Sequence, residues 1–495
     1  MDGTSSQLQD PSLSKTQCLV GGVWVDSLSK ETFPVTDPAT GAITNNYADF
    51  TPEDTVAAIE AAAAALPSFS RTGSRIRARF LRRWFDLVVS NTDDLAKLIT
   101  LENGKVQAEA KGEVAYAASF LEWFSEEAPR VTGATLQASN PTSRAMTIRQ
   151  PIGVCALIAP WNFPAAMITR KVAPALAAGC TVVIKAPPEA PGVALAIAEL
   201  GLRAGLPPGV VNVVTTASHT QEVGRALTTH PLVRKVSFTG STAVGRLLMA
   251  QSAAGIKKIS FELGGNAPFA VFADADLDKA AAALAACKFR NSGQTCVCAN
   301  RVLVQSSVHD AFVAKVVERL RPLKIGSGFD PEVTHGPLIH ERGVNKVKSI
   351  VQDAVSKGAQ VFWQGDLSLG TGCKSACFYP ITVLTGMRSD MLVSSDEIFG
   401  PVIAVYKFET EQEAISLAND SDVGLAGYFF SKDVQRCWRM AEALEVGMVG
   451  INTGVISDPQ LPFGGIKQSG FGKEGSIYGI EEYLVTKLVV TGDIE

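Results

Sequence analysis

The sequence predicts an α/β protein centred on a parallel, doubly wound β-sheet. Short apolar strands alternate with helical segments between Gly153 and Ala253. These strands are apolar throughout, as expected when helices cover both faces of a sheet. A second alternating block begins near Leu263. The 495 residues are enough for about two to four domains.

Helices come first along the chain. Thr51-Pro-Glu-Asp54 has the residues of a capping box and opens a helical pattern that includes the Ala-rich run Ala61 to Ala65. A second helical pattern covers Ser74 to Val89. The strands of the first block are VCALIAP, TVVIKAP, VVNVVT and KVSFTG, and the helices that follow them cover 165–178, 192–204, 220–227 and 242–253. Each strand–helix pair is the repeating unit of a doubly wound sheet.

The second block shows the same alternation of apolar strands and helical segments. Its strands are FAVFA, RVLVQ, PVIAVYKF and AGYFFS, and its helices cover 277–289 and 308–320. Two other segments differ from both blocks. Thr132 to Arg149 is polar and predicts a two-stranded hairpin, and Tyr483 to Thr491 predicts one strand. That strand could pair with the hairpin or with the sheet edge of another subunit.

Composition excludes several function classes. Net charge is −4 and the isoelectric point about 5.9, which argues against nucleic acid and anionic membrane surfaces as partners. No apolar run reaches the roughly 18 residues of a membrane span. Nine Cys and five His are scattered without zinc spacing, so we expect reduced thiols and no metal. The first 17 residues have no apolar core and no Arg, so we expect no secretory or transit peptide and a cytoplasmic location.

Three segments carry candidate catalytic groups. Cys296 follows Gly293 in RNSGQTCVC, a segment suited to a tight turn that presents a thiol; the alternative is that Cys296 and Cys298 are buried small hydrophobes. Glu262 ends a strand before a Gly pair, a good position for a general base, although most such carboxylates are solvated or paired. Asn162 in PWNFP could donate to an oxyanion, or could cap a turn.

A fourth segment suits phosphate binding. In FTGSTAVG, Phe238 to Gly245, a strand ends in a Gly turn that opens a helix, and helix N-termini favour anions. It is neither GxGxxG nor a P-loop, and an ordinary β–α turn is the alternative.

Taken together, these motifs resemble the aldehyde dehydrogenase superfamily. The order is PWNFP, IKxxxxxP, FTGSxxxG, ELGGNxP, GQTC, EIFGP and PFGGxKxSGxGxEG, and the match extends from about Val35 to the C-terminus. The resemblance implies oxidation of an aldehyde to an acid, with Cys296 as nucleophile, Asn162 and the Cys296 backbone N–H as oxyanion donors, and Glu262 as the base that activates water. It implies a Rossmann-type cofactor domain, an α/β catalytic domain and a β oligomerisation arm.

The resemblance also implies domain limits and cofactor contacts. The cofactor domain would take residues 1–130 and 150–262, the catalytic domain 263–455, and the arm 131–149 and 480–495 of a homodimer or homotetramer. The implied cofactor contacts are Ile158, Ala159, Pro160, Trp161, Lys185, Gly240, Ser241, Leu263, Glu397 and Phe399.

The segment after Lys185 bears on the choice of cofactor. Many relatives read Lys-Pro-Ser-Glu, whose Glu binds the ribose 2′-hydroxyl, whereas this chain reads Lys185-Ala-Pro-Pro188-Glu189. Without a carboxylate at position 188, a 2′-phosphate meets no like-charge repulsion. We therefore expect NADP in preference to NAD, unless Glu189 takes the place of the missing carboxylate.

The subfamily that the chain resembles is succinate-semialdehyde dehydrogenase. GQTCVC and PFGGIKQSGFGKEGSIYGIEEYL support this, and Arg170, Arg290 and Ser457 occupy places where that subfamily holds the substrate's distal carboxylate. The implied pathway is 4-aminobutyrate breakdown. A thiol two residues from the nucleophile also suggests that Cys298 forms a reversible disulfide with Cys296.

Other functions remain open at this point. The substrate could be another semialdehyde, such as glutarate semialdehyde, or the enzyme could accept aliphatic aldehydes broadly. A catalytically silent protein on this fold is disfavoured because Asn162, Glu262 and Cys296 are all present. A coenzyme-A-dependent acylating enzyme is disfavoured because Glu262 is available to drive hydrolysis.

Overall fold

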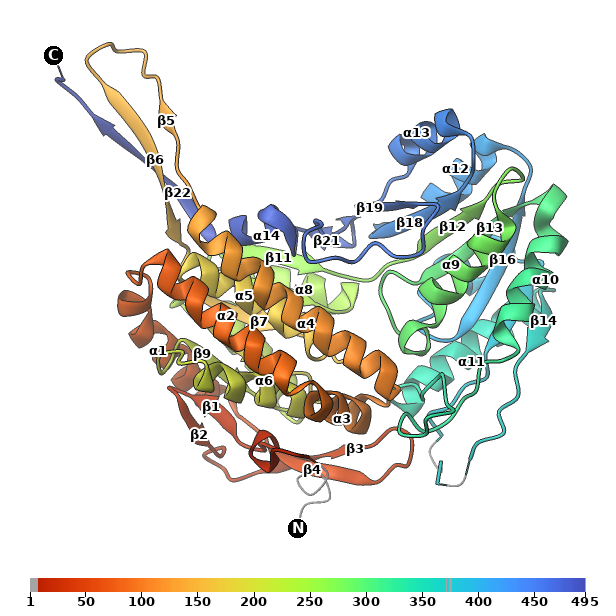
Figure 1. Cartoon of the computed structure of the whole chain (residues 1–495), viewed down its shortest axis with the longest axis horizontal. Helices are drawn as coiled ribbons and strands as arrows, with labels where there is room; N and C mark the ends of the chain where they lie inside the picture. Colours follow the sequence, from red (N-terminus) through yellow and green to blue (C-terminus); the bar gives the residue numbers. More distant parts are fainter. Residues whose placement is uncertain (1–7, 371, 374–375, 495) are drawn as a thin grey trace.

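The computed structural model describes residues 8–370, 372–373 and 376–494, and it contains two large sheets and a projecting arm (Figure 1). Residues 1–7, which are part of the segment used to predict the absence of a leader, lie outside the described residues. Among the described residues, no helix has the length and apolar character needed to cross a membrane.

The first sheet has the strand order β2-β1-β9-β8-β7-β10-β11-β21. Its parallel centre confirms the predicted strands: β7 is Val154–Ile158, β8 Thr181–Lys185, β9 Val211–Val214, β10 Val233–Thr239 and β11 Lys258–Glu262. The edges are antiparallel and were not predicted: β1 is Cys18–Val20, β2 Val23–Val25 and β21 Gly470–Phe471.

Helices cover both faces of this sheet because alternate residues of each strand point to opposite sides. Cys155 and Leu157 of β7 join one core cluster and Ala156 joins the other. The first cluster includes α2 (Ser74–Ser90), α3 (Thr92–Asn103), α4 (Gln107–Glu127), α5 (Ala166–Ala178) and α6 (Gly192–Arg203), and the second includes α1 (Pro52–Phe69), α7 (Thr220–Thr229) and α8 (Thr242–Ala253). Thr51 forms the predicted capping box with Asp54 at the start of α1.

The second sheet has the order β14-β15-β16-β13-β12-β18-β19. Its strands are β12 (Ala267–Val271), β13 (Ala299–Gln305), β14 (Gln360–Gln364), β15 (Thr382–Thr385), β16 (Val402–Phe408), β18 (Ala426–Phe430) and β19 (Met448–Ile451). The sheet packs against the helices α9 (Leu277–Phe289), α10 (His309–Leu320), α11 (Glu341–Ser356), α12 (Glu411–Asn419) and α13 (Val434–Ala443). All its pairs are parallel except β14 with β15.

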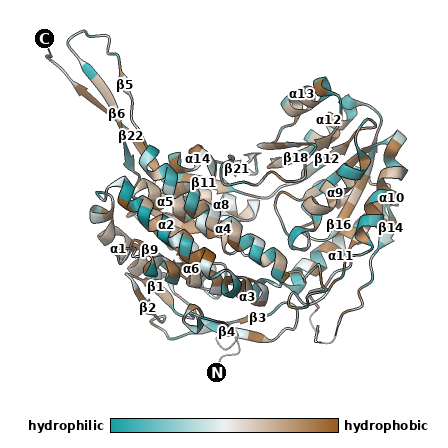
Figure 2. Ribbon diagram, viewed as in Figure 1, coloured by the Kyte–Doolittle hydropathy of each residue, from teal (hydrophilic) through white to brown (hydrophobic). Residues whose placement is uncertain are grey.

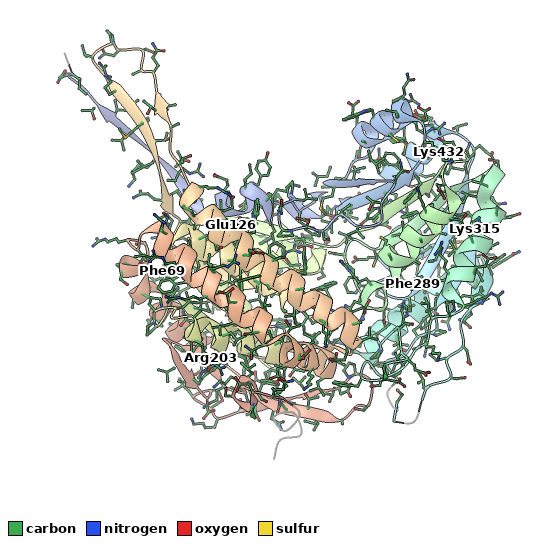
Figure 3. All side chains as sticks on the ribbon, in the orientation of Figure 1. Phe69, Glu126, Arg203, Phe289, Lys315 and Lys432 are labelled. Atoms are coloured by element: carbon green, nitrogen blue, oxygen red, sulfur yellow. The ribbon has the colours of Figure 1, made fainter. Side chains whose placement is uncertain are left out.

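Hydropathy follows this layering. The central strand β16 is largely hydrophobic, whereas the outer helix α2 carries both hydrophilic and hydrophobic residues (Figure 2). Phe289, at the end of α9, is buried, while Lys315 of α10 lies at the outer rim and pairs with Asp278 (2.8 Å) (Figure 3). Burial of the apolar faces is therefore the main source of stability in both halves.

The arm projects away from both sheets (Figure 1). It contains β5 (Thr135–Leu136), β6 (Arg144–Pro151) and β22 (Leu484–Thr491) in the order β22-β6-β5. The polar hairpin is confirmed, and of the two pairings open to the C-terminal strand the structure has the one with the hairpin, antiparallel from Leu484 opposite Pro151 to Thr491 opposite Arg144.

Candidate active site

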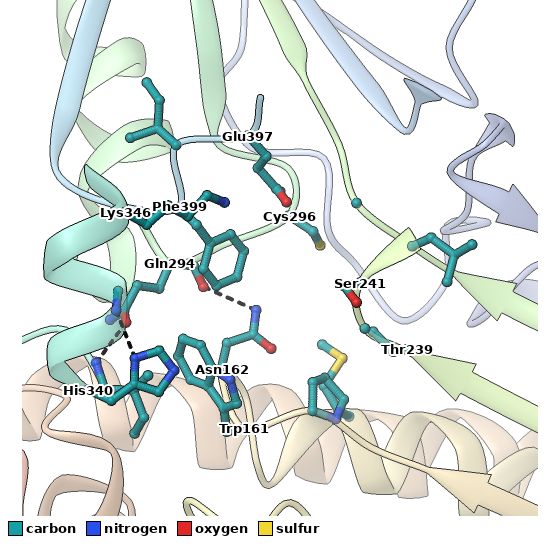
Figure 4. Close-up of a pocket in the computed structure, with 18 residues that line it drawn as sticks. Trp161, Asn162, Thr239, Ser241, Gln294, Cys296, His340, Lys346, Glu397 and Phe399 are labelled. Atoms are coloured by element: carbon teal, nitrogen blue, oxygen red, sulfur yellow. Dashed lines mark hydrogen bonds between the residues drawn. The ribbon is translucent and has the colours of Figure 1, made fainter. Parts of the chain in front are cut away.

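The parallel strands of the first sheet end at one edge, where several candidate residues meet. Thr239 ends β10 opposite Glu262, which ends β11, and Ile158 ends β7 opposite Lys185, which ends β8. Residues that precede β13 and β16 of the second sheet face this edge, among them Cys296 and Glu397 (Figure 4). The site thus lies between carboxyl ends of one sheet and amino ends of the other.

A strained turn positions Cys296. After α9 the chain passes through Asn291, Ser292 and Gly293 with φ values of 51°, 54° and 82°. The left-handed region costs a residue other than Gly about 1–3 kcal/mol, and a Cβ on Gly293 would collide with the backbone of Gly400. The predicted tight turn before the thiol is therefore confirmed.

Glu262 is the immediate partner of the thiol. The Cys296 Sγ–H donates to Glu262 Oε1 at 3.1 Å, and Thr239 Oγ1 donates to Oε2 at 3.3 Å. The guanidinium of Arg170, on α5, forms a buried ion pair with the same Oε2. Burial, followed by the nearby Glu262 carboxylate, raises the pKa of the Cys296 thiol well above its usual value. The thiol is therefore protonated at rest, with a proton acceptor in contact.

Hydrogen bonds to the backbone carbonyl of Asn162 hold this residue beside Cys296 and Glu262. Its carbonyl oxygen accepts from Lys105 Nζ at 2.9 Å and from Asn291 Nδ2 at 3.0 Å. Its Nδ2 donates to the carbonyl of Gln294 at 3.1 Å, and its Oδ1 is buried with no partner among the described residues. The amide is thus fixed at the cavity wall but not fully satisfied.

A cavity of about 360 Å³ opens on one side of Cys296 (Figure 4). Seven of the predicted cofactor contacts line it: Pro160, Trp161, Gly240, Ser241, Leu263, Glu397 and Phe399. Ser241 caps α8 by accepting from the Val244 N–H at 3.4 Å, and the N-terminus of this helix favours anions. Burial raises the pKa of Glu397 to about 7, and its Oε1 accepts from the Gly265 N–H at 3.4 Å.

The three other predicted cofactor contacts lie further along the strand edge. Ile158 and Lys185 are paired across β7 and β8, and the Ala159 N–H donates to the Lys185 carbonyl at 3.3 Å. Burial lowers the pKa of Lys185 to about 8. Lys185 forms no ion pair with any described carboxylate; the charges of Glu189 and Asp49 act on it only from a distance.

A smaller pocket opens on the other side of Cys296. It brings together Arg170, Arg290 and Ser457, which are far apart in the sequence, with Tyr116, Phe163, Met167, Thr295, Val297 and Phe463. The Arg290 guanidinium lies 4.9 Å from the centre of the Phe163 ring, and that of Arg170 lies 4.4 Å from the Phe463 ring. The volume of this pocket, about 10 Å³, holds no more than about one water, so a substrate would enter only if the lining side chains moved. The two arginines match the anionic end of a short substrate, because guanidinium forks fit carboxylates.

Residues 24–489 match the model of the aldehyde dehydrogenase family. The chain belongs to the aldehyde dehydrogenase family. It is 55% identical to succinate-semialdehyde dehydrogenase [NADP(+)] 1 of Schizosaccharomyces pombe over 94% of this chain and 93% of that one. It is 53% identical to the glutarate-semialdehyde dehydrogenase of Pseudomonas aeruginosa, over 99% and 100% of the two chains. An NADP-dependent enzyme of E. coli has a crystal structure that superposes with a TM-score of 0.96 at 51% identity, over 98% and 100%.

In this aldehyde dehydrogenase, Cys298 is turned away from the cavity. It is a free thiol that donates to the carbonyl oxygens of Cys287 (3.2 Å) and Lys288 (3.5 Å), and burial raises its pKa. The Cys298 thiol thus contacts backbone carbonyls, and its disulfide with Cys296 stays a prediction. It predicts peroxide inactivation that dithiothreitol reverses; inactivation that is irreversible, or unchanged in Cys298→Ala, would contradict it.

Several residues of the site were not predicted from the sequence. Glu474 pairs with Arg170 and Lys171, and Glu113 pairs with Lys105 and accepts from the Ala165 N–H at 2.8 Å. Glu474 stands inside the PFGGxKxSGxGxEG motif, which was a signal that could have been used. Glu113 and Tyr116 lie on α4 with no local motif, and only the packing of α4 against α5 brings them to the site.

Proposed function

We propose that this aldehyde dehydrogenase oxidises succinate semialdehyde to succinate with NADP. The observation that carries the proposal is the small pocket that joins Arg170, Arg290 and Ser457 to the nucleophile Cys296. Arg290 forms no ion pair with any described residue, so its charge is available to a substrate carboxylate. The similarity to enzymes named succinate-semialdehyde dehydrogenase [NADP(+)] supports the same substrate and cofactor.

The chemistry begins with a proton transfer along the hydrogen bond between Cys296 and Glu262. Glu262 takes the thiol proton, and the thiolate forms a C–S bond to the aldehyde carbon. Asn162 donates its amide N–H to the oxyanion; a comparable donor contributes about 2.7–4 kcal/mol. The cofactor, when bound, supplies the hydride acceptor that an aldehyde needs, since it has no other leaving group.

The thioester left on Cys296 is then hydrolysed. Glu262 first releases the thiol proton to solvent. It then takes a proton from water as the water oxygen adds to the acyl carbon, the C–S bond breaks, and Glu262 gives that proton to the Cys296 thiolate; the acid formed loses its own proton to solvent and leaves as succinate. This second use of Glu262 supports hydrolysis over transfer of the acyl group to coenzyme A.

The residues around the first cavity suit NADP. The N-terminus of α8 and Ser241 would hold phosphate groups. Lys185 is a buried cation without a paired carboxylate, which favours an additional anion such as the 2′-phosphate. Pro188 brings no charge that would repel it.

The test is absorbance at 340 nm with succinate semialdehyde and either NADP or NAD. We expect fast reduction of NADP and a lower kcat/KM with NAD. No reduction with succinate semialdehyde, but reduction with an uncharged aldehyde, would refute the carboxylate pocket. Glutarate semialdehyde is the second candidate substrate, because a relative named for it is 53% identical; a higher kcat/KM with it would favour that function.

We further propose that residues 1–130 and 150–262 form the cofactor domain, 263–455 the catalytic domain, and the arm an interface of a homodimer or homotetramer in the cytoplasm. Exposed apolar side chains on the arm support the interface: Met146 is 50%, Leu488 59% and Val490 56% exposed. Light scattering of a chain truncated before Leu484 should show a smaller assembly; an unchanged assembly would contradict this role.

A further inference from the structure

The two arginines of the substrate pocket differ in what they already bind. Arg290 makes no ion pair with a described residue. Arg170 is 1% exposed and is bound twice, through Nη2 to Glu262 and through Nε to Glu474. Its Nη1 makes no hydrogen bond to a described residue, although Arg170 lines the pocket. A substrate carboxylate that reaches the pocket therefore meets one available guanidinium and one that already holds the base.

Glu262 has no free oxygen in this arrangement. Oε1 accepts from the Cys296 thiol and Oε2 from Arg170 and Thr239. A carboxylate that acts as a base must give up its charge, and a guanidinium in contact stabilises that charge strongly where solvent is excluded. Arg170 thus opposes the proton transfers that Glu262 must perform.

The charges around Arg170 balance without substrate. Two cations, Arg170 and Lys171, face two carboxylates, Glu262 and Glu474, and the side chains of all four are 12% exposed or less. A substrate carboxylate brings a third negative charge, which Arg290 balances, so what changes at Arg170 is the number of carboxylates that share its guanidinium. Glu262 is the carboxylate in contact with a proton donor, Cys296.

Building on the proposed function, we propose that Arg170 couples the substrate's distal carboxylate to the catalytic base. The incoming carboxylate competes with Glu262 for the Arg170 guanidinium. Glu262, released, accepts the Cys296 proton in the first step and the proton of water in the second. Arg290 supplies affinity for the substrate carboxylate, while Arg170 links occupation of the pocket to catalysis. When the substrate is an uncharged aldehyde, Glu262 stays bound to Arg170.

The first experiment uses the unaltered enzyme with NADP and saturating acetaldehyde, an uncharged aldehyde that lacks the two distal carbons of succinate semialdehyde and so leaves the guanidinium site open. Acetate, added in trans, should occupy the guanidinium site and raise kcat at least about threefold, that is by at least about 0.65 kcal/mol in the barrier. Acetamide has the same shape without the charge and should give no increase. Equal kcat with acetate and acetamide would overturn the proposal.

The second experiment compares Arg170→Gln with Arg290→Gln. With butyraldehyde, an uncharged aldehyde of the same chain length as succinate semialdehyde, Arg170→Gln should raise kcat, because Glu262 is no longer held. Acetate should no longer stimulate acetaldehyde oxidation by this variant. Arg290→Gln should give no such gain and should chiefly raise KM for succinate semialdehyde. A butyraldehyde kcat that falls in a folded Arg170→Gln protein would mean that Arg170 only orients Glu262, and would overturn the proposal. Should Arg170→Gln fail to fold, the acetate experiment decides alone.

Failure of this coupling and failure of the proposed function give different results. Without the proposed function, succinate semialdehyde is not a better substrate than butyraldehyde. Without the coupling, it is better only through a lower KM, and kcat for the two aldehydes is the same.

Discussion

The two cavities that Cys296 lines differ in the kinds of residue that form their walls. The cofactor cavity, about 360 Å³, is formed largely by turns at strand ends and by a helix N-terminus. The proposed substrate pocket is much smaller, and Arg170, Arg290 and aromatic rings are among its lining residues. In the proposed function, turn geometry would hold the cofactor, whereas the buried Arg170 and its paired carboxylates would select the substrate.

Both spaces depend on Cys296, so its replacement has the largest expected effect. Cys296→Ala should lower kcat by at least about 10³-fold with every aldehyde, because no covalent adduct can form. NADP binding, measured by fluorescence titration, should persist. Substantial aldehyde oxidation by the variant would remove the nucleophile from the account.

The substrate pocket is tested by replacing Arg290, the arginine that forms no ion pair with a described residue. Arg290→Gln should raise KM for succinate semialdehyde by about 10- to 150-fold, corresponding to the about 1.5–3 kcal/mol of a hydrogen bond to a charged group. Steady-state kinetics over a wide substrate range measure this. Ser457→Ala serves as a matched control for loss of a neutral contact and should have a smaller effect, and equal effects would contradict a charge-based pocket.

The cofactor cavity is tested at Pro188, the position where many relatives have a Glu that binds the ribose 2′-hydroxyl. Pro188→Glu should shift the ratio of kcat/KM for NADP to that for NAD toward NAD by about tenfold, or ~1.4 kcal/mol, through repulsion of the 2′-phosphate. Pro188→Gln controls for loss of the proline ring. A shift of the same size in both variants would mean that backbone stiffness, not charge, sets the preference.

The smallest expected effect is a pH dependence on the cofactor side alone. The pKa of Lys185 is lowered to about 8 by burial, and the charged groups that act on it are Glu189 and Asp49. Below that pH Lys185 is charged and attracts the 2′-phosphate; above it the charge is lost, so the NADP-to-NAD ratio should fall a few-fold from about pH 7 to about pH 9. Lys185→Arg, which stays charged, should abolish this fall. A ratio that is constant with pH in both proteins would exclude Lys185 as the phosphate contact.

The same contrast explains what the sequence could predict. The strands β7 to β11 and the turn before Cys296 follow from local apolar runs and glycines, and Asn162, Glu262 and Cys296 lie in short motifs. The role of Glu474 and the Lys105–Glu113 pair were not predicted, because the sequence does not show whether a charged residue is buried or lies on the surface. Glu113 reaches the site through the packing of α4 against α5, which no local pattern encodes, whereas Glu474 lies in the PFGGxKxSGxGxEG motif, a signal that was not used. The antiparallel edge strands of the first sheet were missed because they are only two or three residues long.

The most direct test of the central claim is to trap the acyl-enzyme. Glu262→Gln keeps the size of the side chain but can take a proton neither from the Cys296 thiol nor from water, so formation of the thioester is slowed as well and its hydrolysis should be slowed about 10²–10⁴-fold. The reaction is therefore followed until NADP reduction reaches one equivalent per active site. After reaction with succinate semialdehyde and NADP, peptide mass spectrometry should find a succinyl group on Cys296 and on no other thiol. An unmodified Cys296 in a variant that has reduced NADP, or a succinyl group on a different residue, would contradict the account.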